Sequence, residues 1–295
     1  MNTPPADPRL ADVVAVLDRL YPQQTAQSWD QVGLVSGDPE QPVQRILLAV
    51  DPTLAVIEDA RAAGVDLLIT HHPLLLRGVH SVATTSAKGA AVTALVVADL
   101  ALYVAHTNAD VADPGVNHAL AEAAGIVDGE PLTYEDDQPL GIVGELREPL
   151  SLKGFAEQLA GRLPAAPVGL RVSGDPDATV RRVAVHGGAG DGAFDAVRAS
   201  RADVYVTADL RHHPALEARE EARGGTPFLI DAGHWATEWL WLAGARERIA
   251  GALGAAADSV EIEVSQRRTD PWDFLVPSGD PRTTRDDQTQ TGGPR

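Results

Sequence analysis

The sequence predicts an α/β fold of two related halves, each a mixed sheet flanked by helices, with a cleft between them. Short apolar runs typical of buried strands alternate with segments in which apolar residues recur at helical spacing. One strand–helix–strand segment also reappears later in the chain. The 295 residues, 44% of them apolar, are enough for one large or two medium domains with a sizeable core.

The N-terminal part predicts a helix followed by a strand–helix–strand unit. Apolar residues recur at helical spacing over 10–20, and apolar runs typical of strands follow at 45–50 and 65–70. Between those two strands the spacing is helical over 54–63. A helix that connects two strands in this way implies parallel pairing with a right-handed crossover.

Polar side chains follow two strands of this first half. His71 and His72 come directly after the second strand, and His106 and Asp110 come after a further strand at 102–105. Open α/β sheets bind ligands at the carboxyl ends of their strands. We therefore expect these side chains at one edge of the sheet.

Segment 45–70 aligns without a gap on 182–207, which indicates that the two halves are related. The identical pairs are Arg45 and Arg182, Arg61 and Arg198, Ala62 and Ala199, Asp66 and Asp203, and Thr70 and Thr207. The repeat predicts that strand 228–231 corresponds to strand 102–105 and that His234 follows it at the equivalent edge. Polar groups from both halves would then meet in the cleft.

These patterns divide the chain into a first half at 1–130 and a second half at 131–269. Within the second half, residues from about 228 to 269 are expected to return candidate ligands to the cleft. Residues 270–295 are rich in Pro, Gly, Thr, Asp and Arg and poor in apolar residues, so we expect a disordered tail there.

Composition excludes several functional classes. With 42 Asp plus Glu against 24 Lys plus Arg, the net charge of −18 repels phosphate backbones and anionic lipid, so we expect no nucleic-acid partner. The absence of cysteine excludes a disulfide framework, a thiolate nucleophile and an iron–sulfur cluster. Any metal must therefore be held by His, Asp, Glu or backbone oxygen.

The sequence also predicts where the protein works. The N-terminus lacks the basic and apolar blocks of a signal peptide, and no apolar run approaches the roughly 18 residues of a membrane span. We expect a cytoplasmic protein with no membrane partner.

The residues after the strands are candidate metal ligands. His71 and His72 offer two imidazoles that point in different directions, and Asp110 offers hard oxygen ligands. His234 and Glu238 are spaced at i and i+4, which puts both side chains on one face of a helix. Simpler explanations are surface or helix-capping histidines, a turn-capping aspartate and a solvated helix start.

A dinuclear centre with nitrogen and oxygen ligands is the economical explanation for three strand ends that carry such residues. Two ions about 3.5–4 Å apart acidify water and use it as a nucleophile, which points to hydrolysis. The segment from His186 through Gly187 to Gly190 is either a phosphate-holding turn or a turn that needs small residues. Trp29 is expected in the core or the cleft wall, and Asp30 in a turn or as a hydrogen-bond partner of a metal histidine.

Four spaced motifs resemble those of a known family. They are Ser-Trp-Asp-Gln-Val-Gly-Leu at 28–34, Thr-His-His-Pro-Leu at 70–74, His-Thr-Asn-Ala-Asp at 106–110 with Gly-Val-Asn at 115–117, and Gly-His at 233–234 with Glu238. From about residue 10 to 274 the chain resembles the YbgI-like dinuclear metal centre proteins. This family is also called Nif-three-like and is often labelled GTP cyclohydrolase 1 type 2.

The resemblance implies a ligand set and an assembly. The family's metal ligands fall on His71, His72, Asp110, His234 and Glu238, with Glu238 shared by two divalent ions. His/carboxylate sites accept Zn, Mn, Fe, Co or Ni, so the metal stays open. The resemblance also implies a toroidal homohexamer whose metal sites face an internal cavity.

His106 is implied to be a neighbour of the site that could carry protons. One motif departs from the family pattern: Thr207-Ala208-Asp209 stands where relatives read Thr-Gly-Asp followed by a His. The departure leaves the roles of Asp209 and His213 open.

Two functions are consistent with these features. The first is a divalent-metal-dependent hydrolase that acts on a small molecule, possibly GTP or a related nucleotide according to the family label alone. The second is a non-enzymatic protein that binds or delivers metal or has a regulatory role.

Overall fold

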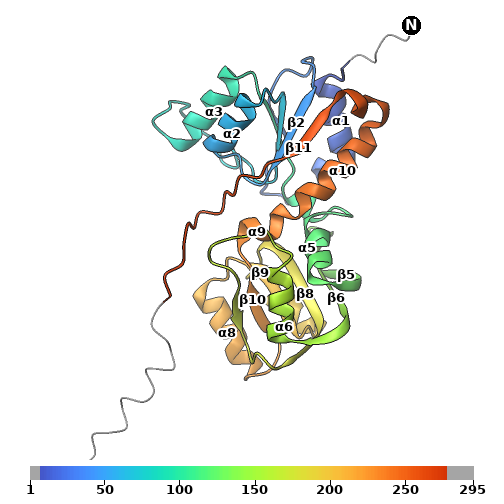
Figure 1. The fold of residues 1–295 in the computed structure, drawn as a ribbon, viewed down its shortest axis with the longest axis vertical. Helices are drawn as coiled ribbons and strands as arrows, with labels where there is room; N and C mark the ends of the chain where they lie inside the picture. Colours follow the sequence, from blue (N-terminus) through green and yellow to red (C-terminus); the bar gives the residue numbers. More distant parts are fainter. Residues whose placement is uncertain (1–6, 278–295) are drawn as a thin grey trace, which may run out of the picture.

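A computed structural model describes residues 7–277, which form two sheets covered by helices (Figure 1). The first sheet has the order β1-β4-β3-β2-β11, and the second has the order β5-β6-β8-β9-β10-β7. The strands of the first sheet are β1 (Gly33–Ser36), β4 (Ala101–Val104), β3 (Leu67–Thr70), β2 (Arg45–Ala49) and β11 (Glu261–Val264). The strands of the second are β5 (Ile126–Glu135), β6 (Gln138–Ser151), β8 (Thr179–Ala189), β9 (Val204–Ala208), β10 (Phe228–Asp231) and β7 (Arg171–Ser173). The predicted α/β fold is confirmed.

The helices and short 3-10 turns of the described residues connect these strands. They are α1 (Leu10–Leu20), η1 (Gln23–Thr25), α2 (Leu54–Ala62), α3 (Ala87–Val97), α4 (Thr107–Asp110), α5 (Val116–Ala124), α6 (Leu152–Ala160), α7 (Phe194–Ser200), α8 (His212–Ala222), α9 (His234–Trp239), α10 (Trp241–Leu253) and η2 (Gly254–Ser259). Side-chain oxygens of Thr53, Ser86 and Ser151 accept hydrogen bonds from the first turns of α2, α3 and α6. None of the helices described is both long and apolar enough to cross a membrane.

The internal repeat is a structural repeat. In the first half β2 pairs in parallel with β3 and β3 with β4, and in the second half β8, β9 and β10 pair in the same way. Asp66 accepts hydrogen bonds from the backbone N–H groups of Gln44 and Arg45, at 2.7 and 2.8 Å. Asp203 does the same for Arg181 and Arg182, both at 2.8 Å. The repeated aspartate is conserved between the halves because it fastens the start of one strand to the next.

The boundary between the halves differs from the predicted one. Most of the segment around 128–138 lies in a long hairpin of β5 and β6, so the division at residue 130 falls within a strand. After β10 the chain leaves the second sheet, and β11 pairs in parallel with β2. The predicted second half includes residues 241–264, yet these residues complete the first sheet and its helical layer, because apolar groups of α10 pack against α1.

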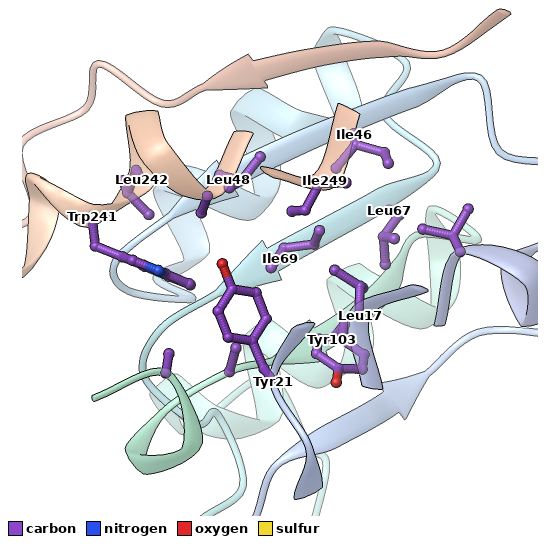
Figure 2. Packing of buried hydrophobic residues seen from close by; sticks show 14 of the residues in the cluster. Leu17, Tyr21, Ile46, Leu48, Leu67, Ile69, Tyr103, Trp241, Leu242 and Ile249 are labelled. Atoms are coloured by element: carbon purple, nitrogen blue, oxygen red, sulfur yellow. The ribbon is translucent and has the colours of Figure 1, made fainter. Parts of the chain in front are cut away.

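A buried cluster beneath the first sheet holds this return in place. Figure 2 shows Trp241 and Leu242 of α10 beside Tyr21 and Ile69. The rings of Tyr21 and Trp241 meet edge to face with centroids 5.4 Å apart. Trp241 also lies 5.7 Å from the ring of His71, so this core supports the first candidate ligand directly.

The C-terminal segment beyond β11 runs past the junction of the two sheets without forming a helix or strand up to residue 277 (Figure 1). Asp270 is buried there, whereas Trp272 and Phe274 are exposed. The rest of the predicted disordered tail, 278–295, lies outside the described residues.

Candidate metal centre

Three segments bring the five predicted ligands together at the junction of the two sheets. His71 and His72 directly follow β3, and Asp110 ends α4, the short helix after β4. His234 and Glu238 occupy one face of α9, which follows β10 of the second sheet. Each ligand lies just past the carboxyl end of a parallel strand, where the repeat places it.

One group of side chains surrounds the first oxygen of Glu238. His71 Nε2 lies 3.5 Å from Glu238 Oε1 and 3.7 Å from Asp110 Oδ1. A second group, His72 and His234, contacts both oxygens of the same carboxylate. His72 Nε2 lies 3.2 Å from Glu238 Oε2, and His234 Nε2 lies 2.9 Å from Oε1 and 3.2 Å from His72 Nε2. The single buried carboxylate therefore contacts two sets of ligands.

The Nδ1 atom of each of these histidines has a hydrogen-bond acceptor. His71 Nδ1 lies 3.0 Å from the carbonyl oxygen of Ala105, which only accepts, so Nδ1 carries the hydrogen. The other two Nδ1 atoms face carboxylates. His72 Nδ1 lies 2.8 Å from Asp51 Oδ1, and His234 Nδ1 lies 2.8 Å from Asp209 Oδ2. This arrangement turns all three Nε2 atoms toward Glu238 and fixes the tautomer that ligates metal.

His106 adjoins the rings of His71 and His72. Its Nδ1 is 3.0 Å from both oxygens of Asp30, and Asp30 also accepts hydrogen bonds from the backbone and hydroxyl of Thr107. Burial raises the pKa of Asp30, but the hydrogen bonds from His106 and Thr107 outweigh it and leave the pKa well below its usual value. Asp30 is thus a charged partner that orients His106, one of the two roles the sequence suggested.

Burial and mutual charge shift the ionisation of the cluster. Burial raises the pKa of Glu238, yet the charges of His72, His71 and His234 outweigh it, so the carboxylate stays ionised with a lowered pKa. Burial lowers the pKa of His72 and His234, but Glu238 and the carboxylates at Nδ1 raise these pKa values to about 10 and about 11. Protons therefore occupy the positions that cations would take.

The donor set fits a divalent metal. Imidazole nitrogen and carboxylate oxygen are the ligands of Zn, Mn, Fe, Co and Ni sites. Glu238 Oε2 is buried and makes no hydrogen bond, which is costly unless another group satisfies it. The ligand atoms of His72, His234 and Glu238 all lie within 4.8 Å of one another, as do those of His71, His72 and His106. The described residues thus contain groups that could hold metal.

Comparison with known proteins identifies the family of this chain. The family model of Duf34/NIF3 (NGG1p interacting factor 3) matches residues 8–271. The chain belongs to the Duf34/NIF3 family.

Two relatives of this Duf34/NIF3 chain share the name GTP cyclohydrolase 1 type 2 homolog. A protein of Streptomyces coelicolor named GTP cyclohydrolase 1 type 2 homolog is 48% identical over 92% of this chain and 96% of its own length. A Mycobacterium bovis protein of the same name is 34% identical over 90% of this chain and 97% of its own. Among solved structures, a Bacillus cereus protein related to NIF3 has a TM-score of 0.83 at 25% identity, covering 93% of this chain and all of that one. Reduced HcgD from Methanocaldococcus jannaschii has a TM-score of 0.72 at 30% identity, covering 88% and 98%.

The glycine segment after His186 has a packing role in this Duf34/NIF3 chain. A Cβ on Gly188 would lie 2.4 Å from Glu238 Oε1 and 3.2 Å from His234 Nε2, and its φ of +68° favours glycine. The N–H groups of Gly187 and Gly188 donate to the side chains of Asn117 and Thr237, at 2.9 and 3.0 Å. These two N–H groups are therefore already paired with side chains, and Gly187 and Gly188 lie near the end of β8.

Asp209 and His213, whose roles the departure from the family motif leaves open, lie in different places. Asp209 follows β9 and orients His234, so Ala208 does not displace it from the site. His213 is exposed on α8, where its ring contacts that of His212 with centroids 5.2 Å apart.

Asp51 and Thr269 were missed by the sequence analysis. Asp51 holds His72 and also accepts a hydrogen bond from the hydroxyl of Thr269, which the C-terminal segment contributes. Asp51 directly follows the strand run at 45–50, so the strand-end rule that found the other polar residues applies to it as well. Thr269 gives no such signal, because only the return of the chain brings it there.

Two cavities open onto the cluster from different sides, and both are lined by His72 and His234. The larger, about 930 Å³, is also lined by Trp29, His106 and Glu238. The smaller, about 630 Å³, is bounded by the C-terminal segment from Thr269 to Val276. Cavities of this size accept small molecules.

Proposed function

We propose that this protein is a divalent-metal-dependent hydrolase with a dinuclear centre that acts on a small molecule. The observation that carries the proposal is the position of Glu238. Its Oε1 faces His71 and His234, and its Oε2 faces His72, so one carboxylate can be shared by two ions. Asp110 with His71, and His72 with His234, would complete the two ligand sets.

The chain's own residues support this chemistry. Two divalent ions at such a centre supply Lewis acidity and lower the pKa of water. Asp51, Asp209 and the carbonyl of Ala105 keep the ligand imidazoles oriented. His106 contacts the rings of His71 and His72 with centroids 5.1 and 5.5 Å apart, and its Nδ1 lies 3.0 Å from the carboxylate of Asp30. His106 is therefore placed to carry a proton to or from a substrate.

GTP is the first substrate to test, because the curated relatives bear the name of a GTP cyclohydrolase homolog. The family resemblance also supports a homohexamer, and we propose that the protein acts in the cytoplasm. The alternative function is non-enzymatic metal binding, delivery or regulation, which the same histidine and carboxylate ligands would serve.

The deciding experiment measures bound metal per chain and product formation from GTP on the same samples. The wild type is compared with Glu238→Ala and with Glu217→Ala, an exposed position on α8. We expect about two ions and turnover in the wild type and the control, and loss of both in Glu238→Ala. Two bound ions without turnover of GTP would favour the carrier or another substrate, and a chain that binds no metal after reconstitution would contradict both functions.

A further inference from the structure

The exposed aromatic side chains are confined to the two openings of the candidate metal centre. The chain has 5 Trp, 4 Tyr and 4 Phe, all of them within the described residues. The exposed ones are Trp29, Tyr134, Trp272 and Phe274. Trp29 and Tyr134 line the larger cavity, and Trp272 and Phe274 line the smaller one. Exposed aromatic groups gathered at a polar site offer stacking surfaces to a ligand.

Trp29 and Tyr134 come from different halves of the molecule and both line the larger cavity. Their exposed fractions are 53% and 67%. The backbone N–H of Ser28 donates to Asp136 Oδ2 at 3.4 Å, which joins the loop of Trp29 to the turn of the β5–β6 hairpin next to Tyr134. The Trp29 ring lies edge to face with His106, with centroids 5.9 Å apart. A planar ring that stacks on Trp29 therefore lies within reach of the cluster.

The charges of this larger cavity disfavour a polyphosphate. Apart from the candidate metal ligands, its lining includes the carboxylates of Glu135 and Asp195. Lys88 is the one Lys or Arg among its lining residues, and its ammonium group donates to the carbonyl oxygen of Leu74. Side chains also occupy the N–H groups of Gly187 and Gly188, so these two donors are not free to bind a triphosphate.

A neutral polar group is available instead. His186 lines the same cavity, and its Nδ1 is buried without a hydrogen-bond partner. Burial lowers the pKa of His186, so the imidazole is neutral and can donate or accept a hydrogen bond without carrying charge. Such a group suits the ring edge of an uncharged heterocycle.

We propose that the larger cavity binds an uncharged planar heterocycle, a free base or a nucleoside, stacked on Trp29 and Tyr134, in preference to a nucleoside triphosphate. Hydrolysis of this ligand rests on the proposed function, whereas its binding to the cavity does not depend on it. It narrows the substrate class from nucleotides in general to their uncharged ring-bearing forms.

The test is calorimetric binding to the full-length, chelator-treated protein. Three probes separate ring from charge: guanosine has the ring alone, GTP has ring and charge, and ribose 5-phosphate has charge without the ring. We expect guanosine to bind, GTP to bind at least about tenfold more weakly because of the acidic lining, and ribose 5-phosphate not to bind. Trp29→Ala should weaken guanosine binding about tenfold, as the loss of one stacking partner does.

Trp272→Ala, at the other opening, is the matched control and should leave guanosine binding unchanged. Tighter binding of GTP than of guanosine, or equal binding by Trp29→Ala and wild type, would overturn the inference. Circular dichroism checks that each sample is folded; if chelation unfolds the protein, guanosine is titrated into the metal-loaded chain and its Trp29→Ala variant. Guanosine binding to a chain that binds no metal would contradict the proposed function only, whereas a metal-loaded chain that turns over GTP but does not bind guanosine would contradict this inference only.

Discussion

Glu238 is the residue that joins the two halves of the candidate centre. It is buried, it faces His71, His72 and His234, and one of its oxygens has no hydrogen bond. A buried carboxylate surrounded by imidazoles is stable only when cations or protons balance it. In the metal-free protein, protons on the histidines meet this need.

Metal binding should therefore release protons. The pKa of His72 is raised to about 10 and that of His234 to about 11, so at pH 7 these imidazoles hold protons that metal must displace. We expect at least one proton released per chain at pH 7, and an affinity that rises about tenfold per pH unit for each displaced proton and falls as the pH is lowered. Titration calorimetry in two buffers of different ionisation enthalpy measures the release. Identical heats in both buffers would contradict it.

Gly188 sets a steric limit on the same site. Gly188→Ala places a methyl group 2.4 Å from Glu238 Oε1 at a φ of +68°, so the carboxylate must move. We expect the variant to lose at least about tenfold in metal affinity, in line with the effect of disturbing a ligand's support. Gly192→Ala is the control, because it lines the same cavity and its Cβ would meet nothing within 4 Å. Equal metal content in both variants would argue against the packing role.

At the scale of elements, the return of the chain through α10 and β11 completes the first sheet. Ile249 of α10 is fully buried in the cluster that includes Tyr21 and Trp241. Ile249→Ala should lower the free energy of unfolding by about 2–5 kcal/mol, as large-to-small changes in a core do. Val97→Ala, at an exposed position of α3, should change it by less than about 0.5 kcal/mol. Urea unfolding followed by circular dichroism compares the two; a small effect of Ile249→Ala would mean that α10 is not part of this core.

At the scale of the whole molecule, the candidate centre lies between the two sheets. His71, His72 and Asp110 follow strands of the first sheet, whereas His234 and Glu238 follow a strand of the second. Metal that binds only the folded chain should therefore stabilise both halves together, by about 2.7 kcal/mol at a free metal concentration 100 times the Kd.

Such stabilisation should raise the Tm by roughly 5–10 °C, because about 1 kcal/mol shifts the Tm of a domain larger than 150 residues by roughly 2–4 °C. Differential scanning calorimetry of chelated and metal-loaded protein tests this. The Glu238→Ala variant should show no such rise. A Tm that metal leaves unchanged in the wild type would contradict a centre shared by the two sheets.

The helices and strands and their repetition can be predicted from the amino-acid sequence alone. Strand 45–50 and helix 54–63 could be predicted to within one residue, because apolar periodicity reflects burial on one face of an element. The gapless repeat predicted the equivalent register of β2–β3 and β8–β9, since Asp66 and Asp203 make the same local hydrogen bonds. The strand-end rule together with the family motifs predicted the five residues that the fold brings together.

The surroundings of those five residues depend on how distant segments of the chain pack together. Contacts between segments far apart in the sequence leave no periodic pattern, so β11 beside β2 and Thr269 beside Asp51 could not be predicted. The low aromatic content gave no hint that Trp29 and Tyr134 share one mouth, because that depends on a hairpin from the other half. Local periodicity is set by each element's own burial, whereas the cavity, its charge and the partners of each imidazole depend on how the two sheets pack.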